Sequence, residues 1–159
     1  MILLVLVDGE GGSKLIKVLS FRIAGELFGI EINDVKEINR NVEYTAVPRA
    51  QDNIVGLFNM RGQIVTIFNL AGIIGYSESV PDDRVTCIIL KSEPENPNHR
   101  GFIIERTGDV IDVAEDMCEP PPANIDSIGK KYIKDVVRLE SDLMRIINTD
   151  LVFGELISD

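Results

Sequence analysis

Residue types that carry out chemistry are few in this sequence, and their surroundings favour structural roles. There is one histidine, His99, and there are two cysteines, Cys87 and Cys118. His99 lies in the polar stretch 93–100, which is broken by prolines and predicts a hairpin tip, where a solvated imidazole is the expected state. One histidine and two cysteines make a four-ligand zinc site only if carboxylates join them. We therefore expect no catalytic residue, no metal site and no cofactor.

The two cysteines lie in different settings. Cys87 is inside the apolar run 85–90, where a buried thiol behaves as a small hydrophobic residue. Cys118 precedes Glu119 and three prolines, and acidic neighbours raise the pKa of a thiol and so lower its reactivity. The sequence does not exclude a disulfide between them, although the cytosolic location that we expect argues against one.

Pairs of adjacent carboxylates are the other candidates for chemistry. Asp82 and Asp83 form one pair, and Glu115 and Asp116 form another. Hydrolases that use two carboxylates hold them at a set separation in a cleft, which adjacent loop residues do not ensure. The simpler role of these carboxylates is to keep the protein soluble. Because of these acidic residues, binding of a small ligand or a metal ion by a β-barrel protein stays the alternative function.

Charge and hydropathy exclude two classes of partner. The 159 residues carry a formal net charge of −10, and residues 80–159 hold 17 acidic against 9 basic side chains. Proteins that grip phosphate backbones need a dense basic surface, so we expect no nucleic-acid partner. The apolar run 2–7 ends at Asp8, whereas a membrane span takes roughly 20 apolar residues. A secretory signal is also missing, so we expect a soluble cytoplasmic protein without direct membrane insertion.

Alternation of apolar and polar residues dominates the chain. With turn residues about every 8 to 12 positions, it predicts a β-sandwich or β-barrel of about nine or ten short strands. A short helix is expected from Asn33 or Asp34, a helical turn over 70–74, and a closing helix from about Thr149 or Asp150 to Ile157. The expected strands are residues 18–24, 28–33, 54–60, 63–70, 85–90, 102–105, 110–113, 132–139 and 143–148.

The first thirteen residues form a separate segment. Residues 2–7 are strongly β-prone, whereas 9–13 have the composition of a flexible linker. An added edge strand and an N-terminal extension both fit residues 1–13. We expect the folded domain to comprise residues 14–159.

The turn at residues 59–62 is the most informative spot. Arg61 places a cation at a tight turn between two apolar strands, and Gly62 is available for positive φ. A solvated arginine on an ordinary hairpin is one interpretation. The other is an arginine tied to a carboxylate, where it shapes a docking surface.

The order of these motifs resembles the CheW-like coupling proteins of bacterial and archaeal chemotaxis. The resemblance covers residues 14–157. It rests on Phe21, Ile23, Phe28-Gly29-Ile30, Ile32, Val35 and Glu37-Ile38, then Pro48, residues 56–65 (GLFNMRGQIV), residues 101–105 and 109–113, Pro120-Pro121 and Tyr132-Ile133-Lys134.

The resemblance implies a mainly β fold of two small SH3-like β-barrel lobes packed side by side, with short helices and a C-terminal helix. It also implies a non-enzymatic adaptor that couples the cytoplasmic tip of a methyl-accepting chemoreceptor to the regulatory domain of a CheA-type histidine kinase. In the family, the motif glutamate and arginine that match Glu37 and Arg61 hold an apolar groove together. The partner-binding residues carried over are Val35, Glu37, Ile38, Arg61 and Gly62, followed by Ile32 and Cys87 for the groove wall.

Overall fold

The computed structural model describes residues 14–48, 53–76, 84–92, 98–122 and 131–152. None of the helices in these ranges is long and apolar enough to cross a membrane. Regular structure there is almost entirely β. The strands are β1 (Leu15–Ile23), β2 (Glu26–Glu31), β3 (Val35–Glu43), β4 (Ile54–Met60), β5 (Gln63–Phe68), β6 (Arg84–Leu90), β7 (His99–Ile104), β8 (Arg106–Ala114), β9 (Cys118–Glu119), β10 (Ile133–Arg138) and β11 (Leu143–Ile147); the short helices are η1 (Ile32–Asp34), α1 (Leu70–Ile73) and η2 (Glu115–Met117).

The chain divides into two compact units. Unit 1 comprises Met1–Arg22, Glu26–Ile32 and Thr107–Asp159, and unit 2 comprises Ile23–Gly25 and Asn33–Arg106. A six-stranded sheet of order β8-β1-β2-β11-β10-β9 builds unit 1, and a five-stranded sheet of order β3-β6-β7-β5-β4 builds unit 2. The mainly β class predicted from the alternating pattern is confirmed.

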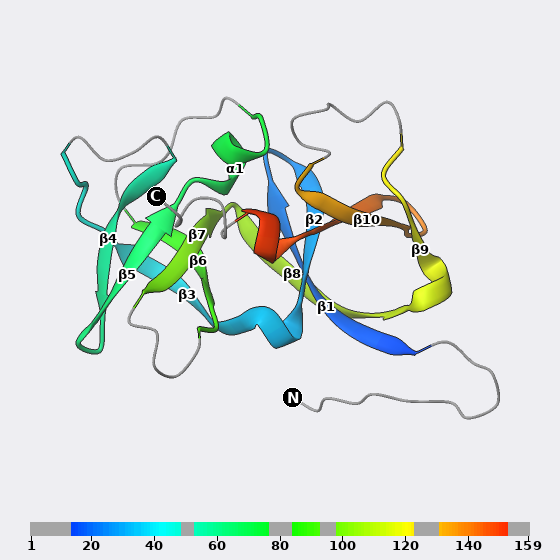
Figure 1. Ribbon diagram of the computed structural model, residues 1–159, viewed down its shortest axis with the longest axis horizontal. Helices are drawn as coiled ribbons and strands as arrows, with labels where there is room; N and C mark the ends of the chain where they lie inside the picture. Colours follow the sequence, from blue (N-terminus) through cyan, green and yellow to red (C-terminus); the bar gives the residue numbers. More distant parts are fainter. Residues whose placement is uncertain (1–13, 49–52, 77–83, 93–97, 123–130, 153–159) are drawn as a thin grey trace. The chain divides into compact units, whose positions relative to one another are not determined.

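The sheet of unit 2 curls until its two ends meet. Thr45, just after β3, exchanges two backbone hydrogen bonds of 2.8 Å with Leu57 on β4. In Figure 1, β4 and β5 form a hairpin beside β7, with which β5 pairs in parallel. The curled sheet encloses a cluster of buried residues: Val42, Met60, Val65, Ile67, Val85, Cys87 and Ile89. This closure places the β4–β5 turn within reach of β3.

Unit 1 depends on a close approach between strands. β2 and β11 pair in parallel, with Gly29 opposite Ile146. A Cβ at position 29 would lie 2.5 Å from Val18 Cγ1, so only glycine fits here without moving its neighbours. One cluster of buried residues in this unit consists of Val18, Leu27, Val113, Val137, Met144 and Ile146.

Local signals predicted most elements and failed in two places. The helix expected after Asn33 is one turn of 3-10 helix, and β3 begins at Val35 because that segment pairs with β6; long-range pairing outweighs a weak helical period. His99 is the first residue of β7, not part of a tip. The closing helix is present over residues 149–152. The remaining positions of its expected range lie outside the described residues, as do residues 1–13.

Candidate functional site

The turn between β4 and β5 holds an arginine in an unusual backbone conformation. Arg61 has φ 52° and Gly62 has φ 86°, the two successive left-handed residues of a type I′ hairpin turn. Asn59 stabilises the turn because its Oδ1 accepts a hydrogen bond of 3.0 Å from the Gly62 N–H. The hairpin predicted at these residues is confirmed, and its geometry fixes where the arginine side chain starts.

The guanidinium of Arg61 reaches across to β3. Its Nη2 lies 2.7 Å from Glu37 Oε1, and its Nη1 lies 3.5 Å from Glu37 Oε2. Two contacts between one guanidinium and one carboxylate fix both distance and orientation. Of the two interpretations of the turn, the arginine tied to a carboxylate is therefore the observed one.

The pair is at the surface of unit 2. The Arg61 side chain is 66% exposed and the Glu37 side chain is 28% exposed. The hydrogen bond to Glu37, followed by its negative charge, raises the pKa of Arg61, so the arginine stays charged at all physiological pH values. An exposed ion pair adds little to folding stability. Its main effect is to hold the β4–β5 turn against β3.

Three other predicted contact residues lie in the same two elements as this pair, β3 and the β4–β5 turn. Val35 and Ile38 are half-buried residues of β3, opposite Leu90 and Ile88 of β6. Gly62 is exposed beside Arg61. Together with the ion pair they give β3 and the turn a mixed apolar and charged character. Ile32 is half-buried and is counted with unit 1.

Cys87 does not belong to the surface. Its side chain is 0% exposed within the core of unit 2, and burial raises the pKa of its thiol to about 12. The prediction that Cys87 contacts a partner as groove wall conflicts with this burial. The residue alternates inward on β6, and it acts by packing behind the surface. The earlier interpretation of Cys87 as a small hydrophobic residue describes its position.

Two exposed apolar residues were missed by sequence reasoning. Leu57 is 36% exposed and Ile64 is 50% exposed. The antiparallel register sets Leu57 opposite Thr66 and Asn59 opposite Ile64, so all four side chains share one face of the hairpin. The signal that could have found them is the same two-residue turn, because it determines which residues face each other on both strands.

The remaining chemical groups form no reactive constellation in the described part of the chain. His99 Nδ1 lies 3.3 Å from Ser92 Oγ. No group of three or more histidine, cysteine or acidic side chains is placed to hold a metal ion among the described residues. The Asp82-Asp83 pair lies outside them. The Glu115-Asp116 pair is exposed in η2.

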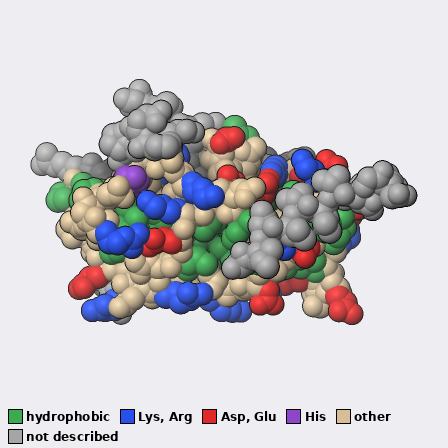
Figure 2. Space-filling model, turned by 90° about the horizontal axis from the view of Figure 1, so that it is seen from below, with side chains coloured by type: hydrophobic (Ala, Val, Ile, Leu, Met, Phe, Trp, Pro, Cys, Tyr) green, Lys and Arg blue, Asp and Glu red, His purple; other side chains and the backbone are tan. Residues whose placement is uncertain are grey.

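Charged side chains are mixed on the surface. On the face of the described residues in Figure 2, Lys and Arg side chains lie among Asp and Glu side chains, not in a separate basic patch. The two units nevertheless differ in composition: unit 1 contains 16 acidic and 8 basic residues, and unit 2 contains 10 and 8. Most of the net charge of −10 therefore resides in unit 1, which carries −8 against −2 for unit 2.

Known proteins share both the sequence pattern and the fold. A family model of the CheW-like domain matches residues 17–156. The chemotaxis protein CheW of Treponema pallidum is 29% identical over 141 residues, which cover 87% of this chain and 82% of that protein. CheW of Thermotoga maritima is 25% identical over 143 residues, covering 90% and 91%. The crystal structure of the scaffolding protein TtCheW from Thermoanaerobacter tengcongensis superimposes with a TM-score of 0.73 at 27% identity, covering 87% of this chain and 92% of that one.

Proposed function

Because this chain belongs to the CheW-like domain family, we propose that it is a chemotaxis adaptor that couples chemoreceptors to a CheA-type histidine kinase. The observation that carries the proposal is the family match over residues 17–156. The chain also covers most of the length of its CheW relatives, 82% and 91% in the two named above. The similarity therefore extends over the whole domain and is not confined to one motif.

The function needs binding surfaces and no reaction centre. An amphipathic helix is recognised by an apolar surface with a few polar groups that set its orientation. Unit 2 presents this combination: half-buried Val35 and Ile38, exposed Leu57 and Ile64, and the Arg61–Glu37 pair. We infer that the protein acts in the cytoplasm, by binding alone.

We infer the partner contacts from the family resemblance, and this arrangement supports them. We assign the cytoplasmic tip of a methyl-accepting receptor and the regulatory domain of the kinase as the two partners. Val35, Glu37, Ile38, Arg61 and Gly62, with Ile32, are the proposed contact residues. Arg61 and Glu37 contribute by holding the turn in one geometry, because an ion pair of this kind specifies shape more than it adds net stability.

Charge reversal of the pair tests the proposal. We expect Arg61→Glu and Glu37→Arg each to reduce co-sedimentation with receptor-containing membranes and kinase by at least about tenfold, because like charges then separate the turn from β3. The double variant that exchanges the two charges should recover part of the binding.

A matched control keeps the test specific. Arg84→Glu reverses another exposed arginine of unit 2, which is 3.7 Å from Glu43, and it should bind as the wild-type protein does. Circular dichroism establishes that every variant is folded. Unchanged co-sedimentation of both single variants of the Arg61–Glu37 pair would overturn the role of that pair.

A further inference from the structure

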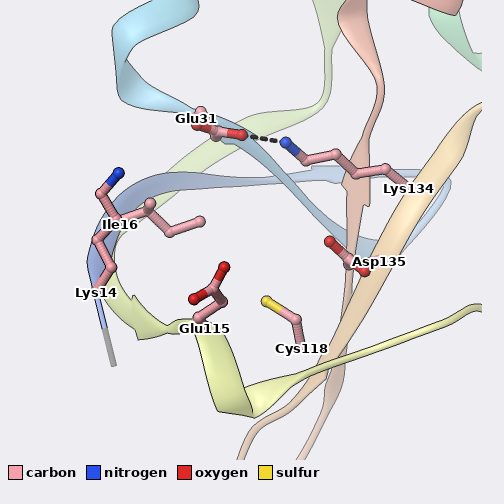
Figure 3. A pocket seen from close by; sticks show the side chains of 7 residues that line it. All are labelled: Lys14, Ile16, Glu31, Glu115, Cys118, Lys134 and Asp135. Atoms are coloured by element: carbon pink, nitrogen blue, oxygen red, sulfur yellow. Dashed lines mark hydrogen bonds and ion pairs between the residues drawn. The ribbon is translucent and has the colours of Figure 1, made fainter. Parts of the chain in front are cut away.

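A pocket of about 470 Å³ lies in unit 1, and neither the predicted site residues nor the proposed coupling role involves it. It is formed where the chain before β1, the start of β1, the end of β2, η2, β9 and β10 come together (Figure 3). Residues that are far apart in the sequence, 14–31 and 115–135, thus form one concave surface. No local sequence motif marks it.

The charges in the pocket do not cancel. Lys134 donates a hydrogen bond to Glu31 on one wall, which neutralises both groups. The carboxylates of Glu115 and Asp135 both point into the pocket in Figure 3, and neither has an ion-pair partner among the described residues. Among the residues that the structure describes, Lys14 is the one further cation in the lining. Within that part of the chain, two carboxylates and one ammonium without ion-pair partners leave a net negative charge in the pocket.

Two uncharged side chains lie between these groups. Ile16 and Cys118 line the pocket, and Cys118 Sγ points toward its centre (Figure 3). Burial raises the pKa of the Cys118 thiol first, and the Asp135 carboxylate raises it next, with Lys134 opposing and Glu115 and Glu31 adding to the rise. The thiol therefore experiences the negative potential that the carboxylates create.

We propose that this pocket binds an arginine or lysine side chain from a basic segment of a partner protein. The aliphatic stem of such a side chain packs on Ile16 and Cys118, and its charged head lies between Glu115 and Asp135. The lining is too polar for an apolar small ligand. The described residues offer no three-ligand metal site, and the acidic excess of unit 1 attracts a basic segment over a distance.

The inference is independent of the coupling function, because none of the proposed contact residues lines the pocket and its test needs neither receptor nor kinase. The rate at which the Cys118 thiol is modified reports the electrostatic potential of the pocket. Methanethiosulfonate reagents with a cationic and an anionic head differ mainly in charge. We expect the cationic reagent to modify Cys118 at least about ten times faster at low salt. The ratio is normalised to the same two reagents acting on the urea-unfolded protein.

Two kinds of variant, one that removes negative charges from the pocket and one that removes a positive charge, test whether the pocket's own charges cause the preference. Glu115→Gln with Asp135→Asn should abolish the preference for the cationic reagent, and Lys14→Gln should increase it. Cys118→Ser should remove the modification altogether, because Cys87 is buried. Equal normalised rates with both reagents in the wild-type protein, or no effect of the paired neutral variant, would overturn the proposal.

Occupancy by a peptide side chain is measured directly. A blocked peptide with one arginine among alanines should protect Cys118 from iodoacetamide, which is uncharged, and a matched peptide with norleucine should not. Equal protection by the two peptides, or protection by neither at millimolar concentration, contradicts binding of a basic side chain. Protection that persists in the paired neutral variant contradicts the role of Glu115 and Asp135.

Discussion

The two units use the same kind of ion pair for different purposes. In unit 2, which also exposes Leu57 and Ile64, Arg61 and Glu37 lie 24 positions apart and meet at the surface. In unit 1, Lys134 and Glu31 lie 103 positions apart and form one wall of a pocket that also contains carboxylates without an ion-pair partner among the described residues. The first pair holds a turn in place. The second neutralises two charges and leaves the remaining carboxylates to determine the potential of the pocket.

The two units differ in charge balance more than in fold. Each is a β-sheet around its own hydrophobic core. Unit 2 contains 10 acidic and 8 basic residues, whereas unit 1 contains 16 and 8. Both units expose large apolar residues, Leu57 and Ile64 in unit 2 and Val110, Met117 and Leu151 in unit 1. A nearly balanced charge suits recognition by shape, and an acidic excess favours attraction of basic partners.

The largest expected effect tests whether the two cores are equivalent. Ile67→Ala in unit 2 and Ile146→Ala in unit 1 each remove a side chain that is 0% exposed. Both should lower the free energy of unfolding by about 2 to 5 kcal/mol, because each leaves a cavity. Urea unfolding measures the loss, and Ile64→Ala, at an exposed position, is the control. A loss no larger than that of the control would show that the position is not part of a packed core.

An intermediate effect distinguishes the two thiols by pH. The folded-state pKa of Cys87 is about 12, whereas an exposed thiol titrates near pH 9, so the folded protein keeps a proton that the unfolded chain releases. The resulting stability is fully present below pH 9 and is lost as the pH rises toward 12. At pH 10.5 the loss is about 2 kcal/mol.

Urea unfolding at pH 8 and pH 10.5 isolates that contribution. The wild-type protein should lose more stability between the two pH values than Cys87→Ala does. Cys118→Ala should lose nearly as much as the wild-type protein, since the Cys118 thiol, whose pKa is also raised, is less buried than the Cys87 thiol. The same alkaline loss in Cys87→Ala as in the wild-type protein would assign it to other groups.

The smallest effect concerns the stability that the ion pairs provide. Lys134→Ala should lower the free energy of unfolding by less than about 1 kcal/mol, because the partners are partly solvated. Arg61→Ala should shift the urea midpoint no further than experimental error. In 1 M salt, each variant should be as stable as the wild-type protein. A loss well above 1 kcal/mol that survives in high salt would mean that the pair in unit 1 has a structural role.

Prediction from the sequence succeeded where the signal was local. The alternating pattern identified most strands, and the Arg61-Gly62 pair identified the tight turn, because two-residue hairpins require positive φ. It failed for the segment after Asn33, where pairing with β6 replaced the expected helix. It also placed Cys87 at a partner surface, although the inward face of β6 buries that residue. Which face of a strand is buried depends on the other strands of the sheet.

The sequence by itself determined the β class of the protein, the hairpin turn, and, through its ordered motifs, the resemblance to CheW-like proteins. Only the tertiary structure decided which carboxylate meets Arg61, which apolar residues stay exposed, and that Glu115 and Asp135 face one pocket. The physical reason is the range of the interactions. Alternation and turn preferences act over a few residues, whereas ion pairs and pockets arise from segments that sheet closure brings together.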